Sequence, residues 1–137
     1  IYGAHFWDDV GTNPLGTRHP ECVYSVGHTH VSSERMKANI ISLDSDLLLD
    51  FCNSLSPSMY TRTDLEPQPR IGLIAERVQE QITAHALPTN IIGTRFEAIE
   101  KGGEIEELLG LDYARLSVCL LGAVQELTKR VQQLESA

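Results

Sequence analysis

The chain has 137 residues and a formal net charge of -8, and 42% of its residues are hydrophobic while 22% are charged. This length and composition indicate one folded, globular domain with a modest core. The acidic balance and the lack of any lysine and arginine run argue against binding to a phosphate backbone, so nucleic acid is not an expected partner. No apolar stretch approaches the roughly 20 residues of a membrane span, and no signal-peptide pattern opens the chain. We therefore expect no membrane partner and either synthesis in the cytosol or a chain whose natural start is missing.

The first 31 residues differ in composition from the rest. They hold four glycines, two prolines and four of the five histidines, with only short β-prone runs such as 22–26. Frequent glycine and proline between short β-prone runs predict an irregular, β-rich stub that packs poorly alone. We interpret 1–31 as the end of a preceding fibrous domain, and Ile1 in place of a starting Met agrees with this interpretation.

Three cysteines, Cys22, Cys52 and Cys119, are widely spaced and odd in number. They form neither a disulfide framework nor a Cys-x-x-Cys metal site. Cys52 and Cys119 lie in apolar runs and are predicted to be small core residues. No motif requires a cofactor.

A helix is predicted over 43–55, where apolar residues crowd one helical window. Asp44 or Ser42 is placed to cap its start, and Pro57 stops it. A second helix is expected from Glu76 to about His85.

Between these helices the sequence predicts a β-hairpin. Residues 58–62 and 71–75 are β-prone, and the turn-forming Pro67 and Pro69 separate them. After the second helix, 87–110 is ambiguous. Strand candidates at 91–92 and 95–99 and a turn at 101–103 suggest an extended arm.

The segment 111–134 shows the clearest helical pattern. Its apolar residues alternate steps of four and three and form a possible coiled-coil seam: Leu120, Val124, Leu127, Val131 and Leu134. Valine alternating with leucine suits two or three strands without choosing between them. The seam spans under three heptads, so an amphipathic helix packed on its own domain explains it equally well. Gly122 lies off the seam and weakens the helix.

The candidate catalytic residues are Ser32 and Lys37, a possible nucleophile five residues before a possible base. A serine hydroxyl is inert unless its proton is removed, and a lysine can remove it only when burial or nearby positive charge keeps the amine neutral. A loop serine and a solvated surface lysine would give the same pattern. The spacing alone is therefore weak evidence for a Ser-Lys dyad.

Further motifs come after the dyad in a fixed order: Pro57 and Tyr60, 70–79, Leu111-Asp112-Tyr113, Leu116, and 123–127. Together with the Ser32 segment, they resemble the C-terminal intramolecular chaperone domain of phage tailspikes, tail fibres and neck appendages, the self-cleaving S74 peptidase family. The resemblance runs from about Ser32 to the C-terminus. Two positions depart from it: Ser33 stands where relatives usually carry Asp, and Met36 where they often carry Leu.

This resemblance implies an α+β fold in a small homotrimer, with the β-hairpin, the extended arm and a C-terminal helix in a short three-stranded coiled coil. Residues 32–137 would be the chaperone domain, and 1–31 the stub of an upstream fibre or spike. The chaperone would set the register of that fibre and then release itself as a serine endopeptidase through Ser32 and Lys37. The implied setting is the host cytoplasm during virion assembly, with the passenger retained in the virion tail.

The cleaved bond is open between two choices. Attack by the Ser32 hydroxyl on the carbonyl of Val31 closes a five-membered ring and cuts Val31-Ser32. A serine supplied by a neighbouring chain would be free to cut Ser32-Ser33 instead. The oxyanion donors would be backbone N–H groups, which leave no trace in a sequence.

A weaker hypothesis concerns His28 and His30, which share a face if their segment is extended. Three copies around an axis would offer six nitrogens to a transition metal, although two surface histidines explain the pattern more simply. We expect no metal as the main interpretation.

Two other functions stay open. The chain could be a non-cleaving trimerisation module or a receptor-binding tip that keeps its C-terminal domain. It could also be an attached regulatory domain that frees an upstream partner of another kind, as in certain eukaryotic membrane-bound transcription factors that resemble the family.

Overall fold

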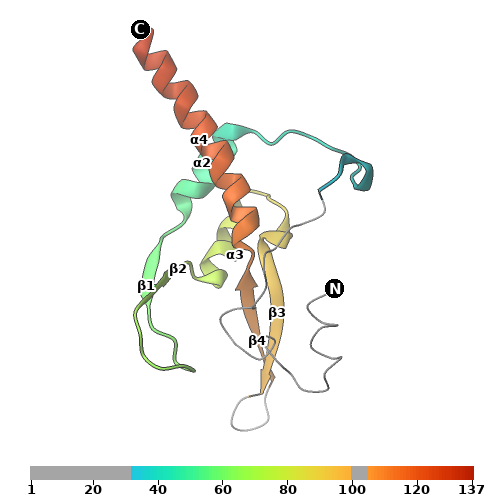
Figure 1. Ribbon diagram of the computed structural model, residues 1–137, viewed down its shortest axis with the longest axis vertical. Helices are drawn as coiled ribbons and strands as arrows, with labels where there is room; N and C mark the ends of the chain where they lie inside the picture. The colour runs from blue at the N-terminus through green and yellow to red at the C-terminus, as the bar shows by residue number, and fades with distance from the viewer. Residues whose placement is uncertain (1–31, 100–104) are drawn as a thin grey trace. The chain divides into compact units, whose positions relative to one another are not determined.

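The computed structural model describes residues 32–99 and 105–137 (Figure 1). The chain divides into two compact units, Ile1–Ile40 and Ile41–Ala137. The predicted stub at 1–31, with Cys22, His28 and His30, lies outside the described residues. The helices and the two small sheets of the second unit agree with the expected α+β class.

Helix α2, Ser45–Ser54, is the first element of this unit and confirms the predicted helix. Its N-cap is Asp44, whose side chain accepts a hydrogen bond from the backbone N–H of Asp46 at 3.0 Å. That bond satisfies one of the amides left without a partner at a helix start. Leu48, Leu49 and Phe51 are buried on its inner face, and Phe51 is fully so.

The predicted β-hairpin is confirmed. Strand β1, Ser58–Tyr60, pairs antiparallel with β2, Arg70–Gly72, and places Met59 opposite Ile71. The connection contains both turn prolines, as expected from their fixed φ and missing N–H. The second predicted helix is α3, Ala75–Ala84, which buries Val78 and Ile82.

The ambiguous stretch resolves into an antiparallel pair of strands. A short 3-10 turn, η2 (Thr89–Ile91), leads into β3, Ile92–Ile99, which pairs with β4, Ile105–Leu111. The expected arm is thus a two-stranded ribbon. Its second strand had no separate prediction, because Leu108, Leu109 and Leu111 suit a helix and a strand alike.

The long helix α4 runs over Tyr113–Glu135, two residues later than the predicted start at Leu111. Asp112 explains the shift, because its side chain accepts from the backbone N–H of Arg115 at 3.1 Å and caps the helix there. Among the described ranges, none of the helices is both long and apolar enough to cross a lipid bilayer.

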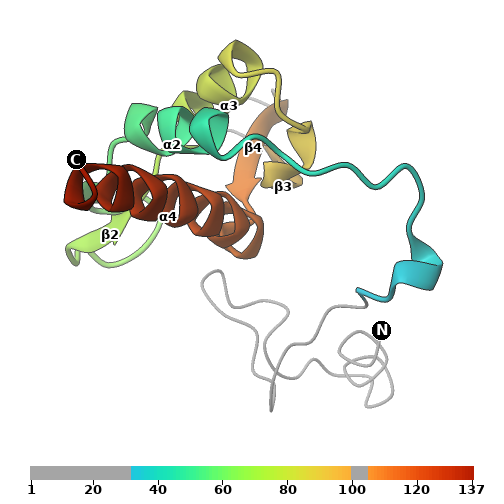
Figure 2. The same cartoon turned by 90° about the horizontal axis from the view of Figure 1, so that it is seen from above.

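Helices α2 and α4 lie side by side (Figures 1 and 2). Their close approach requires Gly122, because a Cβ at that position would lie 2.2 Å from the Cδ1 of Leu48. The glycine that weakens the isolated helix thus allows the packed pair. The core between the helices and the sheets is formed by nine buried residues: Leu48, Phe51, Val78, Ile82, Leu87, Ile91, Ile92, Leu116 and Cys119.

The prediction that Cys52 and Cys119 are core residues is confirmed. Cys119 is buried, and Cys52 is half-buried and packs against the core. Burial raises the pKa of both thiols, and the nearby Cys52 raises that of Cys119 further. Both are therefore poor nucleophiles, and neither competes with the serine as a catalytic group.

Candidate functional site

The segment around the candidate dyad forms a single 3-10 turn, η1, over Glu34–Met36. Ser33 is its N-cap, and its side-chain oxygen accepts from the backbone N–H of Arg35 at 3.3 Å. The turn is closed by two backbone bonds, from Met36 N to Ser33 O and from Lys37 N to Glu34 O, both at 3.0 Å. Ser33 suits this position because its short hydroxyl side chain can satisfy a free N–H at the start of a helix.

This turn brings the side chains of Ser32 and Lys37 together. The Nζ atom of Lys37 donates a hydrogen bond to the Oγ atom of Ser32 at 2.7 Å. The distance lies within the range expected of a nucleophile and its base. The Ser33 hydroxyl, the rival nucleophile one residue along, is engaged as the cap.

Burial distinguishes this pair from a working dyad, although the distance from Lys37 Nζ to Ser32 Oγ is suitable. A general base has to accept the serine proton, and only a neutral amine can do so. Ser32 and Lys37 are both exposed, whereas a neutral lysine requires removal from water or nearby positive charge. A working dyad would therefore need a desolvation that the described residues do not provide.

A second candidate surface is the apolar face of α4. All five residues of the predicted seam are exposed, from 49% for Leu127 and Val131 to 76% for Leu134. The last turns of α4 extend beyond α2, and residues 131–137 are all exposed (Figure 1). Aligned apolar side chains in water at helical spacing are typical of a binding surface.

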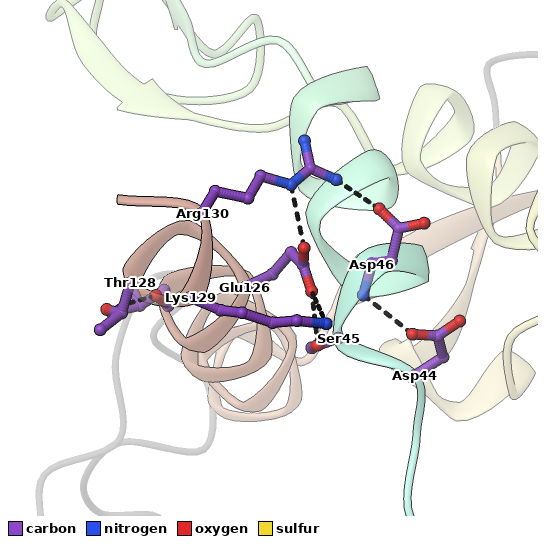
Figure 3. A network of polar contacts seen from close by, with 8 residues as sticks. Asp44, Ser45, Asp46, Glu126, Thr128, Lys129 and Arg130 are labelled. Carbon is purple, nitrogen blue, oxygen red and sulfur yellow. Dashed lines mark hydrogen bonds and ion pairs between the residues drawn. The ribbon is translucent and has the colours of Figure 1, made fainter. Parts of the chain in front are cut away.

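One functional feature escaped the sequence analysis, namely the buried carboxylate of Glu126. Its residue is 5% exposed and lies on the side of α4 that faces α2 (Figure 3). The Ser45 hydroxyl donates to Glu126 Oε1 at 2.9 Å, and Arg130 Nε donates to Oε2 at 2.9 Å. The same guanidinium reaches Asp46 Oδ1 at 2.5 Å. These contacts join α4 to the first turn of α2.

The bonds from Arg130 and Ser45 lower the pKa of Glu126, and Arg130 is the larger cause. A carboxylate also gains from lying near the amino end of α2, where the helix dipole is positive. The signal for this residue was present in the sequence, since Leu116, Cys119, Ala123 and Glu126 follow one another at helical steps. A charged group at the end of an apolar row marks a buried polar contact, but its partners on α2 are about 80 residues away.

Comparison with known proteins shows which family part of the chain resembles. Residues 32–87 match the family model Peptidase_S74, described as the chaperone of endosialidase. This part of the chain is similar to the S74 peptidase family. The resemblance expected from the sequence is thereby confirmed, and the S74 family is one of self-cleaving peptidases. The match begins at Ser32 and includes Lys37. A search of curated proteins found no match to the chain.

Two solved structures share the fold of this chain. A crystal structure described as a novel intramolecular chaperone superposes with a TM-score of 0.55 at 17% identity, over 72% of this chain and 99% of the other. The carboxy-terminal domain of the bacteriophage T5 L-shaped tail fibre, with its intramolecular chaperone domain, gives a TM-score of 0.61 at 10% identity. That match covers 92% of this chain and 36% of the T5 chain. The mixed fold of helices and small sheets is thus that of phage intramolecular chaperones.

Proposed function

We propose that this chain ends a phage tail fibre or spike, that its S74 domain assembles as a homotrimer, and that Ser32 and Lys37 then cut the domain from the fibre. The observation that carries the proposal is the 2.7 Å hydrogen bond between Lys37 Nζ and Ser32 Oγ in a chain similar to the self-cleaving S74 family. In this proposal 1–31 is the end of the passenger and 32–137 the chaperone. Assembly takes place in the host cytoplasm.

The chaperone role answers a physical problem of fibres. Interwoven β-structures have high contact order, and their strands slip in register. A small trimer at one end aligns the three chains before the fibre folds. The T5 neighbour, in which an intramolecular chaperone accompanies the tail fibre, supports this role and supports the upstream fibre as partner.

The trimer contact is assigned to the exposed seam of α4, defined by Leu120, Val124, Leu127, Val131 and Leu134. Parallel helices that bury such a row against one another remove its apolar surface from water, which contributes roughly 25 cal/mol per Å². The length of free helix beyond α2 gives room for two further copies.

The proposed cleavage step uses Ser32 as the nucleophile and Lys37 as the base. Neutral Lys37 takes the proton of Ser32 Oγ as that oxygen bonds to the carbonyl carbon of Val31, and the proton passes to the leaving nitrogen of Ser32. The peptide bond becomes an ester between Val31 and the Ser32 side chain. Water then hydrolyses the ester, which leaves a carboxylate on Val31 and a free amine on Ser32. A serine attacking from a neighbouring copy would cut Ser32-Ser33 by the same chemistry.

Assembly would switch this step on. In the single chain Lys37 is exposed, so its amine is of no use as a base. Covering of the pair by neighbouring copies would exclude water and favour the neutral amine. Release would then occur only after the passenger has trimerised, and the separated fibre would be kinetically trapped in its folded state.

The exposure of Ser32 and Lys37 also favours a second candidate, a trimerisation module or receptor-binding tip that never cleaves. Denatured intact mass of the purified protein distinguishes the two functions. We expect two fragments that meet at Val31-Ser32 or Ser32-Ser33 in the parent, and one full-length mass in Ser32→Ala and Lys37→Met. Ser33→Ala is the matched control and should still cleave, because its hydroxyl only caps η1. A single full-length mass in a trimeric parent would leave the non-cleaving module as the function.

A further inference from the structure

The strongest unassigned feature is a cluster of four residues that we call the clamp: Ser45, Asp46, Glu126 and Arg130. The carboxylate of Glu126 is held by the Ser45 hydroxyl and by Arg130, both at 2.9 Å, and Arg130 extends the contact to Asp46 (Figure 3). The side chain of Glu126 is 6% exposed. A neighbouring contact between α2 and α4 is apolar, with Leu48 against Gly122.

The clamp is a poor source of stability, because the side chain of Glu126 is buried while those of Arg130 and Asp46 are about half exposed. The cost of removing the charges from water cancels most of their attraction, so well-packed apolar residues would serve as well or better. What such a cluster does supply is one specified geometry, because a displaced helix would leave the carboxylate buried without partners. The clamp therefore defines the position of α2 along α4 more sharply than the apolar contact does.

The position of the clamp in the chain connects this fixed geometry with the segment that carries Ser32 and Lys37. Ser45 and Asp46 form the first turn of α2, and residues 38–44, which the structure describes in full, connect that turn to Lys37 without helix or strand. Glu126 and Arg130 lie on α4, one side of which is the exposed seam. The clamp thus joins α4, the helix that we assign to assembly, to the start of α2, which the 38–44 connection links to Lys37.

We propose that Glu126 is a positioning residue for cleavage, and that the clamp transmits assembly of α4 to the dyad segment by holding the first turn of α2. This inference rests on the proposed function. When copies gather on the seam, α4 becomes fixed, and the clamp fixes the end of the 38–44 connection in turn. Ser32 and Lys37 are then joined by a connection of fixed length to a fixed point, and neighbouring copies can cover them. Without the clamp the trimer still forms through the seam, but the dyad reaches its covered state less often.

The test compares cleavage rates in trimers. Each variant is refolded from denaturant, its trimer mass is followed by light scattering, and full-length chain is quantified against time at two protein concentrations. We expect Glu126→Gln, Ser45→Ala and Arg130→Gln to form trimers of the parent's mass and to cleave at least about tenfold more slowly at both concentrations. Ser45→Thr keeps the hydroxyl and should restore the rate to within about twofold of the parent.

Lys129→Gln is the matched control for Arg130→Gln. Its ammonium is 3.9 Å from Glu126 Oε1 and 64% exposed, so the contact is weak and solvated. We expect this variant to cleave at the parent's rate. Equal rates in all variants would overturn the proposal. So would slow cleavage that is fully explained by loss of trimer, since the clamp would then act on stability alone.

Hydrogen exchange tests the clamp without any cleavage. In a Ser32→Ala chain, exchange at the amides of 45–48 should slow several-fold on passing from dilute chain to trimer, and this slowing should be absent when Glu126→Gln is added. If slowing is seen while the parent fails to cut itself, the clamp couples assembly to α2 but has no cleavage to position, and autoproteolysis is wrong. If the parent cuts itself but exchange at 45–48 does not respond to assembly, the transmission is wrong and the proposed function stands.

Discussion

The two faces of α4 carry similar residues and have opposite environments. One face, which holds Leu116, Cys119 and Ala123, is buried against α2 and the core. The other, which holds Leu127 and Val131, is about half exposed although it is equally apolar. Hydrophobicity alone therefore does not determine what a helical face does. The first face builds the fold, and the second has no partner among the described residues.

The largest change in stability is expected from breaking the buried face. Leu116→Ala removes a side chain that is 9% exposed and leaves a cavity in the core that also holds Phe51 and Val78. We expect the free energy of unfolding to fall by about 2–5 kcal/mol. Urea unfolding of the dilute chain measures it, and a loss below about 1 kcal/mol would mean that α4 is not packed as described.

A smaller loss is expected at the close contact between α2 and α4. Gly122→Ala gains up to about 1 kcal/mol in helix propensity, but the new Cβ would lie 2.2 Å from Leu48 Cδ1. Overpacking of this kind costs about 1–3 kcal/mol, so we expect net destabilisation. In the Leu48→Ala background the 2.2 Å contact is gone and only the Cβ of residue 48 remains, at 3.2 Å, so Gly122→Ala should cost less there. Equal effects in both backgrounds would contradict the close approach.

The exposed face should respond differently to the same kind of substitution. Leu127→Ala, at a residue 49% exposed, should change unfolding of the dilute chain by less than about 0.5 kcal/mol. It should nevertheless weaken the trimer, since the seam loses a central leucine. Urea unfolding of the dilute chain checks the first statement, and sedimentation equilibrium of this variant beside the parent checks the second. Unchanged self-association would argue that the seam is not the contact.

The smallest effect is expected on the stability of the folded chain at acidic pH. Because the bonds from Arg130 and Ser45 lower the pKa of Glu126 in the folded chain, its contribution to stability is present above the ordinary glutamate range of about 4.3 and is lost as pH falls through the folded pKa. The stability of the parent should therefore fall more steeply than that of Glu126→Gln as pH drops below about 4.5. Thermal unfolding at a series of pH values gives the comparison, and parallel curves would show that the carboxylate is not held as described.

Local signals in the sequence were enough for most of the elements. Asp44 placed the start of α2, the prolines marked the hairpin connection, and the period of the last segment predicted α4. These features act over a few residues, so the chain reveals them without any tertiary context. The β4 strand was missed because its leucines suit either structure, and its pairing with β3 made the choice.

The candidate site divides in the same way. Ser32 and Lys37 were named from their spacing and family resemblance, and the turn at 34–36 is local enough to bring them to 2.7 Å. Their role in cleavage stays a prediction. The role of Glu126 was not foreseen, because its partners Ser45 and Asp46 are distant in the chain and nothing in the local pattern pairs them.

By itself, then, the sequence determined most of the segments that become helices or strands, where capping and turn residues end them, and which side chains meet across one turn. The tertiary structure alone decided that Gly122 is a contact point, that Glu126 is buried with partners, and that one apolar face of α4 is covered while the other is not. The physical reason is the distance along the chain over which each kind of interaction acts. Periodicity, capping and turn chemistry act between near neighbours, whereas burial depends on which distant elements pack together.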